Sequence, residues 1–279
     1  KIKVAIEKKS GIKIDIASNP EFMREGFAIE DFMNPDRIVV GIENKNSQKL
    51  IENLYLYWIR KDFPILFTDI KTAELIKYSS NAFLMTKIAF INEISDLCEA
   101  SNCNISDLTT AMGMDERIGS KFLNPGPGVG GSCFPKDSLA LSHIAKKYNQ
   151  KLSILDQVID SNNQRFINMA EKIKKIAKND RKIAILGLSF KAGTDDVRMS
   201  PSIEIIKHLL KGNFQITAFD PEAIENSQKM LGNKITYSKN TQECFDSAKH
   251  IAILTEWSEF KEIKNYDNFN NKIIIDLRN

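Results

Sequence analysis

Long apolar runs and concentrated basic stretches are absent from this 279-residue sequence. No run approaches the ~18 apolar residues of a membrane-spanning helix, so no membrane partner is expected. The net charge is only +3, and no basic stretch is interleaved with aromatic residues, so nucleic acid is not an expected partner. Residues 1–7 do not form a signal peptide. We expect a soluble globular protein of one large or two ordinary domains.

Cysteine and histidine are also scarce, with four and three copies. No Cys-x-x-Cys pair occurs, and His143, His208 and His250 are not at ligand spacing, so no metal site is expected. Free thiols in a reduced, cytoplasmic setting are the simpler interpretation. The cysteines are Cys98, Cys103, Cys133 and Cys244.

A dinucleotide-binding G-x-G-x-x-G fingerprint is missing as well, because the spacing from Gly187 to Gly193 does not fit it. The chain does not begin with methionine, and residues 1–67 hold too few strand patterns for a self-sufficient doubly wound domain. We therefore expect a sheet that has lost its beginning.

The most distinctive feature that is present is a glycine- and proline-rich loop at 124–137, which contains Cys133. Pro135 suits the first position of a helix, so Cys133 is expected on a bent loop at a helix N-terminus. Free N–H groups and the helix dipole stabilise a thiolate there, and Lys136 adds positive charge. Asp137 is near enough to return to the thiol. A nucleophile and an incidental cysteine in a glycine-rich turn both fit this spacing.

Short apolar runs alternate with helical patterns at both ends of the chain, which is typical of parallel α/β sheets. Strands are expected at 12–17, 37–41, 64–67, 182–188, 215–220, 250–255 and 272–276, and helices at 47–60, 201–211 and 242–248. Residues 68–180 show only helical periodicity, with helices at 69–102, 105–112 and 154–178. The predicted fold is α/β, with a partial first sheet, a central all-helical segment that contains a long helix, and a nearly complete final βαβ domain.

Polar residues on these elements have two interpretations each. Lys77 and Asn81 share one face of the long helix, and by themselves they are best explained as a solvated pair. Lys191 and Arg198 follow a strand at the sheet edge where ligands bind, although surface cations are more common. The Lys-rich helix end at 170–178 suggests a solvent-crossing connector.

Four segments together carry a more specific signal. They are Ser18 to Gly26, Ala73 to Leu84, Gly128 to Asp137 and Gly187 to Arg198. In this order and spacing the sequence resembles the UDP-glucose/GDP-mannose dehydrogenase family over the whole chain. The resemblance implies the C-terminal remnant of an NAD-binding Rossmann domain at 1–67, a helical central and dimerisation domain with the cysteine loop at 68–180, and a UDP-sugar-binding Rossmann-like domain at 181–279.

The resemblance implies an NAD-dependent enzyme that oxidises UDP-glucose to UDP-glucuronate in two steps. Cys133 attacks the intermediate aldehyde, and a thiohemiacetal and then a thioester form on its sulfur. Covalent capture divides one difficult oxidation into easier steps and retains a reactive aldehyde.

Five other residues share the implied catalytic work. Lys77 and Asn81 direct a cation and an amide at the developing oxyanion. Asp137 is a base or water-binding group. Glu21 acts on the hydrolytic water, and Glu25 is a second acid nearby.

Further contacts are carried over from the family in the same way. The implied substrate contacts are Phe22, Met23, Arg117, Phe122, Asn124, Gly130, Phe190, Lys191 and Arg278. The implied cofactor contacts are Glu25, Lys136 and Arg198. Arg117 resembles an arginine that enters a neighbouring subunit's site, so a homodimer or a higher homo-oligomer is expected.

Alternative functions stay open. A truncated, inactive chain that keeps nucleotide-sugar binding and dimerisation is one, and the missing phosphate-binding loop supports it. A related UDP-N-acetylhexosamine or GDP-mannose dehydrogenase is another, because the cysteine and the lysine are shared. A thiol hydrolase is weaker, since no histidine occupies a recognisable partner position.

Overall fold

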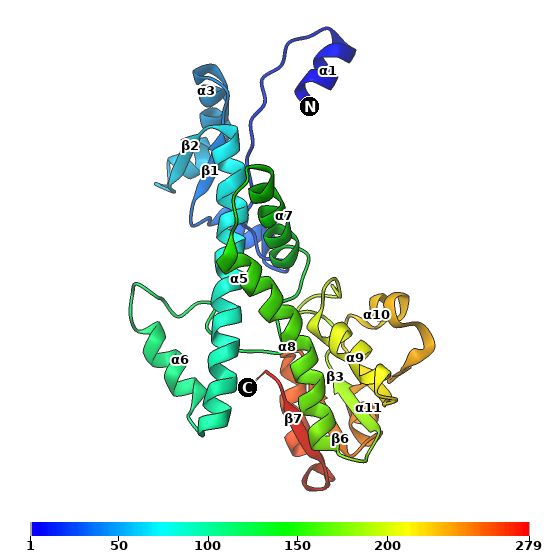
Figure 1. Cartoon of the computed structure of the whole chain (residues 1–279). Coiled ribbons are helices and arrows are strands. Elements are labelled where there is room, and N and C mark those ends of the chain that lie inside the picture. The colour runs from blue at the N-terminus through cyan, green and yellow to red at the C-terminus, as the bar shows by residue number, and fades with distance from the viewer. Residues whose placement is uncertain (1, 279) are drawn as a thin grey trace. The chain divides into compact units, whose positions relative to one another are not determined.

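The computed structural model describes residues 2–278, and the chain divides into two compact units, Lys1–Ser80 and Asn81–Asn279 (Figure 1). The boundary falls inside the long helix α5 (Ile70–Ser101), so each unit contains part of it. Within the described residues, no helix combines the length and the apolar character needed to cross a membrane. The division into three functional parts stays a prediction.

The first unit contains a two-stranded parallel sheet and several helices. Its elements are α1 (Ile2–Ser10), α2 (Ala28–Met33), β1 (Ile38–Gly41), α3 (Lys45–Leu54), α4 (Leu56–Ile59), β2 (Ile65–Thr68) and the start of α5. Strand β1 is fully buried and pairs with β2, as the apolar runs predict. Asn44 caps α3 by accepting hydrogen bonds from the N–H groups of Asn46 and Ser47, and Asp69 accepts one from Thr72 in the first turn of α5.

The prediction of a strand at 12–17 is wrong. This stretch forms no ladder, and a single antiparallel bridge joins Ser18 to Gly41. Side chains satisfy its backbone instead, because the N–H of Ile14 donates to Glu7 and that of Ile16 to Glu43. An alternating pattern becomes a strand only where a neighbouring strand supplies hydrogen bonds. The helix expected at 47–60 is present but is interrupted between α3 and α4.

The second unit joins a helical segment to a five-stranded parallel sheet. The helical segment holds the rest of α5, α6 (Ile105–Gly113), α7 (Phe134–Lys147) and α8 (Ser153–Ala177). The sheet region holds β3 (Lys182–Leu186), α9 (Pro201–Lys211), β4 (Gln215–Phe219), α10 (Ile224–Leu231), β5 (Thr236–Tyr237), α11 (Thr241–Asp246), β6 (His250–Ile253) and β7 (Ile273–Asp276), with 3-10 turns η1 (Gly232–Lys234), η2 (Ser258–Asn265) and η3 (Phe269–Asn271). The strand order is β5-β4-β3-β6-β7, so the α/β prediction is confirmed.

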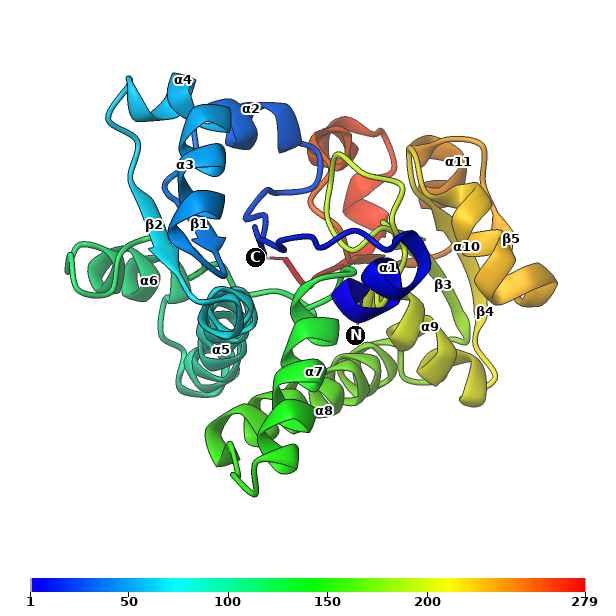
Figure 2. The ribbon, with the colours of Figure 1, turned by 90° about the horizontal axis from the view of Figure 1, so that it is seen from above.

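Strand β3 lies in the middle of this sheet and contributes to two cores. Ile183 and Ile185 face a cluster built with α8 and α9, and Ala184 and Leu186 face a cluster built with α11 and η2. Helices α9 and α11 therefore cover opposite faces of the sheet (Figure 2). The chain order reverses direction between β3 and β6, and ligands of parallel sheets bind at such a switch point, beyond the carboxyl ends of the strands.

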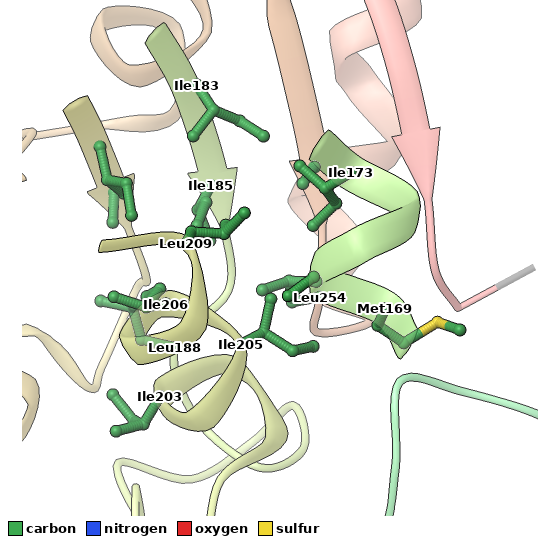
Figure 3. Packing of buried hydrophobic residues seen from close by; sticks show 14 of the residues in the cluster. Met169, Ile173, Ile183, Ile185, Leu188, Ile203, Ile205, Ile206, Leu209 and Leu254 are labelled. Carbon is green, nitrogen blue, oxygen red and sulfur yellow. The ribbon is translucent and has the colours of Figure 1, made fainter. Parts of the chain in front are cut away.

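The C-terminal half of α8 belongs to the core of this sheet, so the solvent-crossing connector expected at 170–178 is wrong. Met169 and Ile173 are buried among residues of β3 and α9 (Figure 3). The lysines in this stretch occupy the other face of the helix, since Ala170 and Ala177 are also buried. The Lys-rich composition concealed an amphipathic helix with one apolar stripe.

Candidate active site

The cysteine loop ends where α7 begins. Cys133 is the N-cap residue of α7, and its carbonyl accepts the N–H of Asp137 at 2.9 Å. The helix starts at Phe134, so Pro135 occupies the second helical position instead of the first, and its missing N–H still costs no helical bond. The Cys133 thiol is exposed and lies 3.6 Å from the hydroxyl of Ser132. A cysteine sulfur is thus accessible at a helix N-terminus, as predicted.

Asp137 lies buried in the first turn of α7, four residues after Cys133. Its carboxylate is 3 % exposed and accepts a 2.6 Å hydrogen bond from the amide of Asn81 on α5. The ammonium of Lys136 lies 2.9 Å from the other carboxylate oxygen. The structure therefore brings Asn81, Lys136 and Asp137 together beside the first turn of α7. A carboxylate held in this way has a fixed position beside the start of the helix.

Glycines let the cysteine loop approach the segment that follows β3. A Cβ on Gly130 would lie 2.5 Å from the carbonyl oxygen of Met199 and 3.2 Å from the Cβ of Phe190. The N–H of Gly131 donates to the carbonyl of Arg198 at 3.0 Å. Two segments that were selected separately from the sequence are thus in contact within the second unit.

The segment after β3 is held from below by Asp220 at the end of β4. The Asp220 carboxylate accepts the N–H groups of Leu188 and Ser189 at 2.7 and 3.0 Å and the indole N–H of Trp257 at 3.1 Å. Asp220 therefore has a structural role at the switch point, because it binds the backbone of the segment that follows β3. Lys191 lies over the ring of Phe190, with 5.5 Å between the ammonium and the ring centroid.

A separate polar group lies within the first unit. The ammonium of Lys77 donates to the backbone carbonyl of Glu21 and lies 3.2 Å from its carboxylate. The same ammonium is 5.3 Å from the ring centroid of Phe22, and Arg37 lies over that ring. The Glu21 carboxylate also accepts the N–H of Met23 at 2.7 Å. Lys77 is therefore paired and 17 % exposed, which contradicts the residue-only interpretation of a solvated Lys–Asn pair.

The remaining predicted contacts differ in their surroundings. Arg117 is exposed and pairs with Asp115, and its hydrogen bonds lower the pKa of that carboxyl. Phe122 has a positive φ of 65° and packs against Phe134. Arg278 pairs with Glu256 and lies against Gly126 of the cysteine loop, and burial lowers the pKa of its guanidinium.

Three other predicted residues are exposed or partly exposed. Glu25 and Asn124 are exposed, and Arg198 pairs with Asp196 at 2.8 Å while its side chain stays 67 % exposed. Among residues 2–278, no three metal-ligating side chains converge.

The resemblance predicts NAD as the cofactor, but the described residues supply only some of the groups that would bind it. The parallel pair β1–β2 is present, but residues 2–278 hold no G-x-G-x-x-G loop for its pyrophosphate. Arg198 has an exposed guanidinium that suits a phosphate, although an internal carboxylate already pairs with it. We therefore assign no residue to a hydride-transfer step.

Three buried polar residues escaped the sequence analysis: Asn92 on α5 and Asn162 and Arg165 on α8. Their side chains bind the backbone of the cysteine loop. The sequence does contain a hint of their role, because each of these polar residues interrupts the apolar stripe of its helix, as Asn81 does. Without the fold, however, a polar residue in a stripe does not reveal its partner.

Comparison with known proteins identifies the family of this chain. Three parts of the chain match the UDP-glucose/GDP-mannose dehydrogenase family: its NAD binding domain at residues 1–59, its central domain at 71–164 and its UDP binding domain at 184–279. The chain belongs to this family, as the four sequence segments predicted.

Three individual proteins illustrate how similar the chain is to other family members. The UDP-glucose 6-dehydrogenase of Rickettsia felis is 50% identical over 99% of this chain, and that of Rhizobium meliloti is 41% identical over 95%. A solved UDP-glucose dehydrogenase from Pyrobaculum islandicum superimposes with a TM-score of 0.92 at 33% identity over 100% of this chain. The chain spans 63%, 62% and 63% of the lengths of these three proteins.

Proposed function

We propose that this chain is part of an enzyme that oxidises the C6 alcohol of UDP-glucose to the carboxylate of UDP-glucuronate. The observation that carries the proposal is Cys133 at the N-terminus of α7, next to the buried Asn81–Asp137 pair. Relatives named UDP-glucose 6-dehydrogenase, at 50% identity, support the choice of substrate. The family's NAD binding domain supports NAD as the oxidant. Bound NAD would accept one hydride from the C6 alcohol, which would leave the aldehyde, and a second NAD would accept one from the thiohemiacetal on Cys133, which would leave the thioester. A cytoplasmic location is part of the proposal.

In the proposed mechanism the Cys133 sulfur attacks the C6 carbonyl carbon of the bound aldehyde, and a C–S bond forms as the oxygen becomes an oxyanion. Asn81 carries a second amide hydrogen besides the one bound to Asp137, and we assign it to that oxyanion. Lys77 is the proposed source of the accompanying cation, as the resemblance to the family implies. Removal of one such donor typically costs about 3 kcal/mol of transition-state stabilisation.

Release of the product requires hydrolysis of the C6–S bond. Water adds to the thioester carbon, the C–S bond breaks, and the sulfur leaves as the thiolate or thiol of Cys133. Asp137 is the proposed base or water-binding group near the cysteine, because it is buried and already accepts a hydrogen bond. Glu21 is assigned to the hydrolytic water, and Glu25 is a second acid in the same segment.

Substrate and cofactor contacts complete the proposal. The family's UDP binding domain at 184–279 supports Phe190, Lys191 and Arg278 as contacts of the nucleotide sugar. The other proposed substrate contacts are Phe22, Met23, Arg117, Phe122, Asn124 and Gly130. The proposed cofactor contacts are Glu25, Lys136 and Arg198.

A homodimer is the proposed assembly. Phe83, Phe90 and Leu97 follow each other at seven-residue steps on α5 and are 66%, 50% and 62% exposed. An exposed apolar stripe of this kind favours a helix of a second copy. Light scattering after size exclusion should show a dimer that Phe90→Glu weakens. Leu139→Glu on α7, at a site that is 51% exposed, should leave the dimer intact.

Activity and binding assays test the function. A form of the protein that includes the complete NAD-binding domain should reduce NAD in the presence of UDP-glucose, and Cys133→Ser should abolish turnover while Cys103→Ser preserves it. Turnover that survives in Cys133→Ser would exclude this residue as the nucleophile.

For the present chain, calorimetric titration should show UDP-glucose binding and weak NAD binding. Binding without turnover in every form would favour an inactive nucleotide-sugar binder, and preference for an N-acetylhexosamine would favour the related dehydrogenases.

A further inference from the structure

The cysteine loop depends on distant side chains for its conformation. Residues 124–133 form neither helix nor strand, and Pro125 and Pro127 have no N–H to donate. A loop with so few internal constraints is flexible unless other elements bind its backbone. Because Cys133 ends this loop, whatever holds the loop also sets the position of the sulfur.

Gly126 is held from two helices at once. Its N–H donates to the side-chain oxygen of Asn92 on α5 at 2.8 Å, and its carbonyl accepts the Nε–H of Arg165 on α8 at 2.6 Å. Both side chains are buried, so water does not compete for these bonds. The backbone N–H and C=O of Gly126 are thus bound by side chains from two different helices.

Val129 is held in a similar way by one residue. The amide of Asn162 accepts the N–H of Val129 at 2.7 Å and donates to its carbonyl at 3.0 Å. This paired geometry copies the exchange between two residues of a β-ladder, and it fixes a point four residues before Cys133. Asn162 and Arg165 are three residues apart, so they project from one face of α8.

The buried charge of Arg165 is compensated within the same cluster. Its side chain is 8% exposed, and one guanidinium nitrogen lies 3.0 Å from Asp96 and 3.1 Å from the carbonyl of Asn92. A buried cation in a helix interface is costly compared with an apolar residue of similar size. Packing of α5 on α8 does not require such a group, whereas the Gly126 carbonyl does require a hydrogen-bond donor, which Arg165 supplies.

We infer that Asn92, Asn162 and Arg165 are positioning residues for Cys133, which act through the loop backbone and touch no reacting atom. Their catalytic meaning rests on the proposed function, but their effect on the thiol does not. A hydrogen bond to a charged group can shift a two-state loop equilibrium about tenfold. Because Cys133 is already exposed, releasing the loop adds little access and instead lets the sulfur leave its position at the positive end of the α7 dipole.

The test measures iodoacetamide alkylation of Cys133 relative to exposed Cys103 in the same molecule, by peptide mass spectrometry on the present chain. Cys103 is an internal reference because it lies beyond the end of α5 and outside the loop. The variants are Arg165→Met and Asn162→Leu, with the milder Arg165→Lys and Asn162→Asp as versions that should fold. The matched control is Lys172→Met, which breaks an ion pair of 2.5 Å with Glu99 between the same two helices and does not involve the loop.

The rate ratio of Cys133 to Cys103 should fall about threefold to tenfold in the Arg165 and Asn162 variants, with Arg165→Lys the least affected, and should not change in Lys172→Met. A general loss of stability would raise the alkylation rates of both cysteines, in the control variant as well, and would leave the ratio of Cys133 to Cys103 constant. An unchanged ratio in Arg165→Met and in the Asn162 variants, with the fold intact by circular dichroism, would overturn the inference. A fall in the ratio together with a failed dehydrogenase assay would preserve the positioning role and reject only the proposed reaction.

Discussion

The amide of Asn81 donates a 2.6 Å hydrogen bond to the carboxylate of Asp137, and the two residues are 5% and 3% exposed. The bond links α5 to the first turn of α7, directly after the exposed cysteine. A buried carboxylate that lacks such a donor is strongly unfavourable, so Asn81 serves stability before it serves any reaction.

Removal of the Asn81 donor should destabilise the second unit. Asn81→Leu leaves the Asp137 carboxylate without its buried amide partner, and the free energy of unfolding should fall by about 2 kcal/mol. Urea denaturation followed by circular dichroism measures it. The double variant Asn81→Leu/Asp137→Leu is the control, because it removes both polar groups and should recover part of the loss. Strict additivity of the two single changes would contradict a direct interaction.

Gly187 at the end of β3 should not accept a side chain. Its φ is +101°, and a Cβ there would lie 2.4 Å from the Cβ of Thr255 and 2.5 Å from its backbone nitrogen. Gly187→Ala should therefore lower the free energy of unfolding by about 3 kcal/mol. Gly193→Ala provides the comparison, since its φ of +76° is also positive but no atom lies within 4 Å of the added Cβ. It should lose only about 1 kcal/mol, and equal losses would rule out the steric contact as the cause.

The end of α8 should behave as core. Ile173 is fully buried against the sheet, and Ile173→Ala should cost about 3 kcal/mol in thermal or urea unfolding. Lys175 is exposed two residues further on, so Lys175→Ala should change stability by less than about 0.5 kcal/mol. Similarly small losses of stability at both positions would instead support the predicted solvent-crossing connector at 170–178.

Cys244 should resist alkylation under conditions that modify the exposed cysteines. Burial raises the pKa of its thiol to about 12, so the thiol keeps its proton over the whole neutral range and becomes a thiolate only as the pH approaches that value. At about pH 8.5, iodoacetamide should modify Cys103 and leave Cys244 intact in the folded protein. Denaturation in urea should make the two react alike. Rapid labelling of Cys244 in the folded chain would show that the core opens readily.

Several features were predictable from local chemistry alone. Apolar runs bounded by turn residues located β3, β4, β6 and β7, and three- and four-residue apolar spacing located α5, α6, α8 and α9. The glycines and prolines around the cysteine, with Pro135 after it, placed Cys133 at a helix start within one residue. The roles assigned to individual site residues stay predictions.

Other features were not predictable, because they depend on contacts between distant residues. Residues 12–17 alternate like a strand, yet within residues 2–278 no neighbouring strand pairs with them. Strand β5 has only two residues, which is too short for a strand pattern, and helix α10 was not among the expected elements. The apolar stripe of α8 could be assigned to the core only once β3 and α9 were known to pack against it.

By itself, the sequence determined the family, the α/β class of the fold and the cysteine at a helix N-terminus, because each rests on residues that are near neighbours in the chain. Only the tertiary structure decided what surrounds that cysteine. Asn81 meets Asp137 across 56 positions, and Asn162 and Arg165 bind the loop from 33 and 39 positions away. Local propensity cannot encode such pairs, since a buried polar side chain is satisfied by whichever backbone or carboxylate the folded core places beside it.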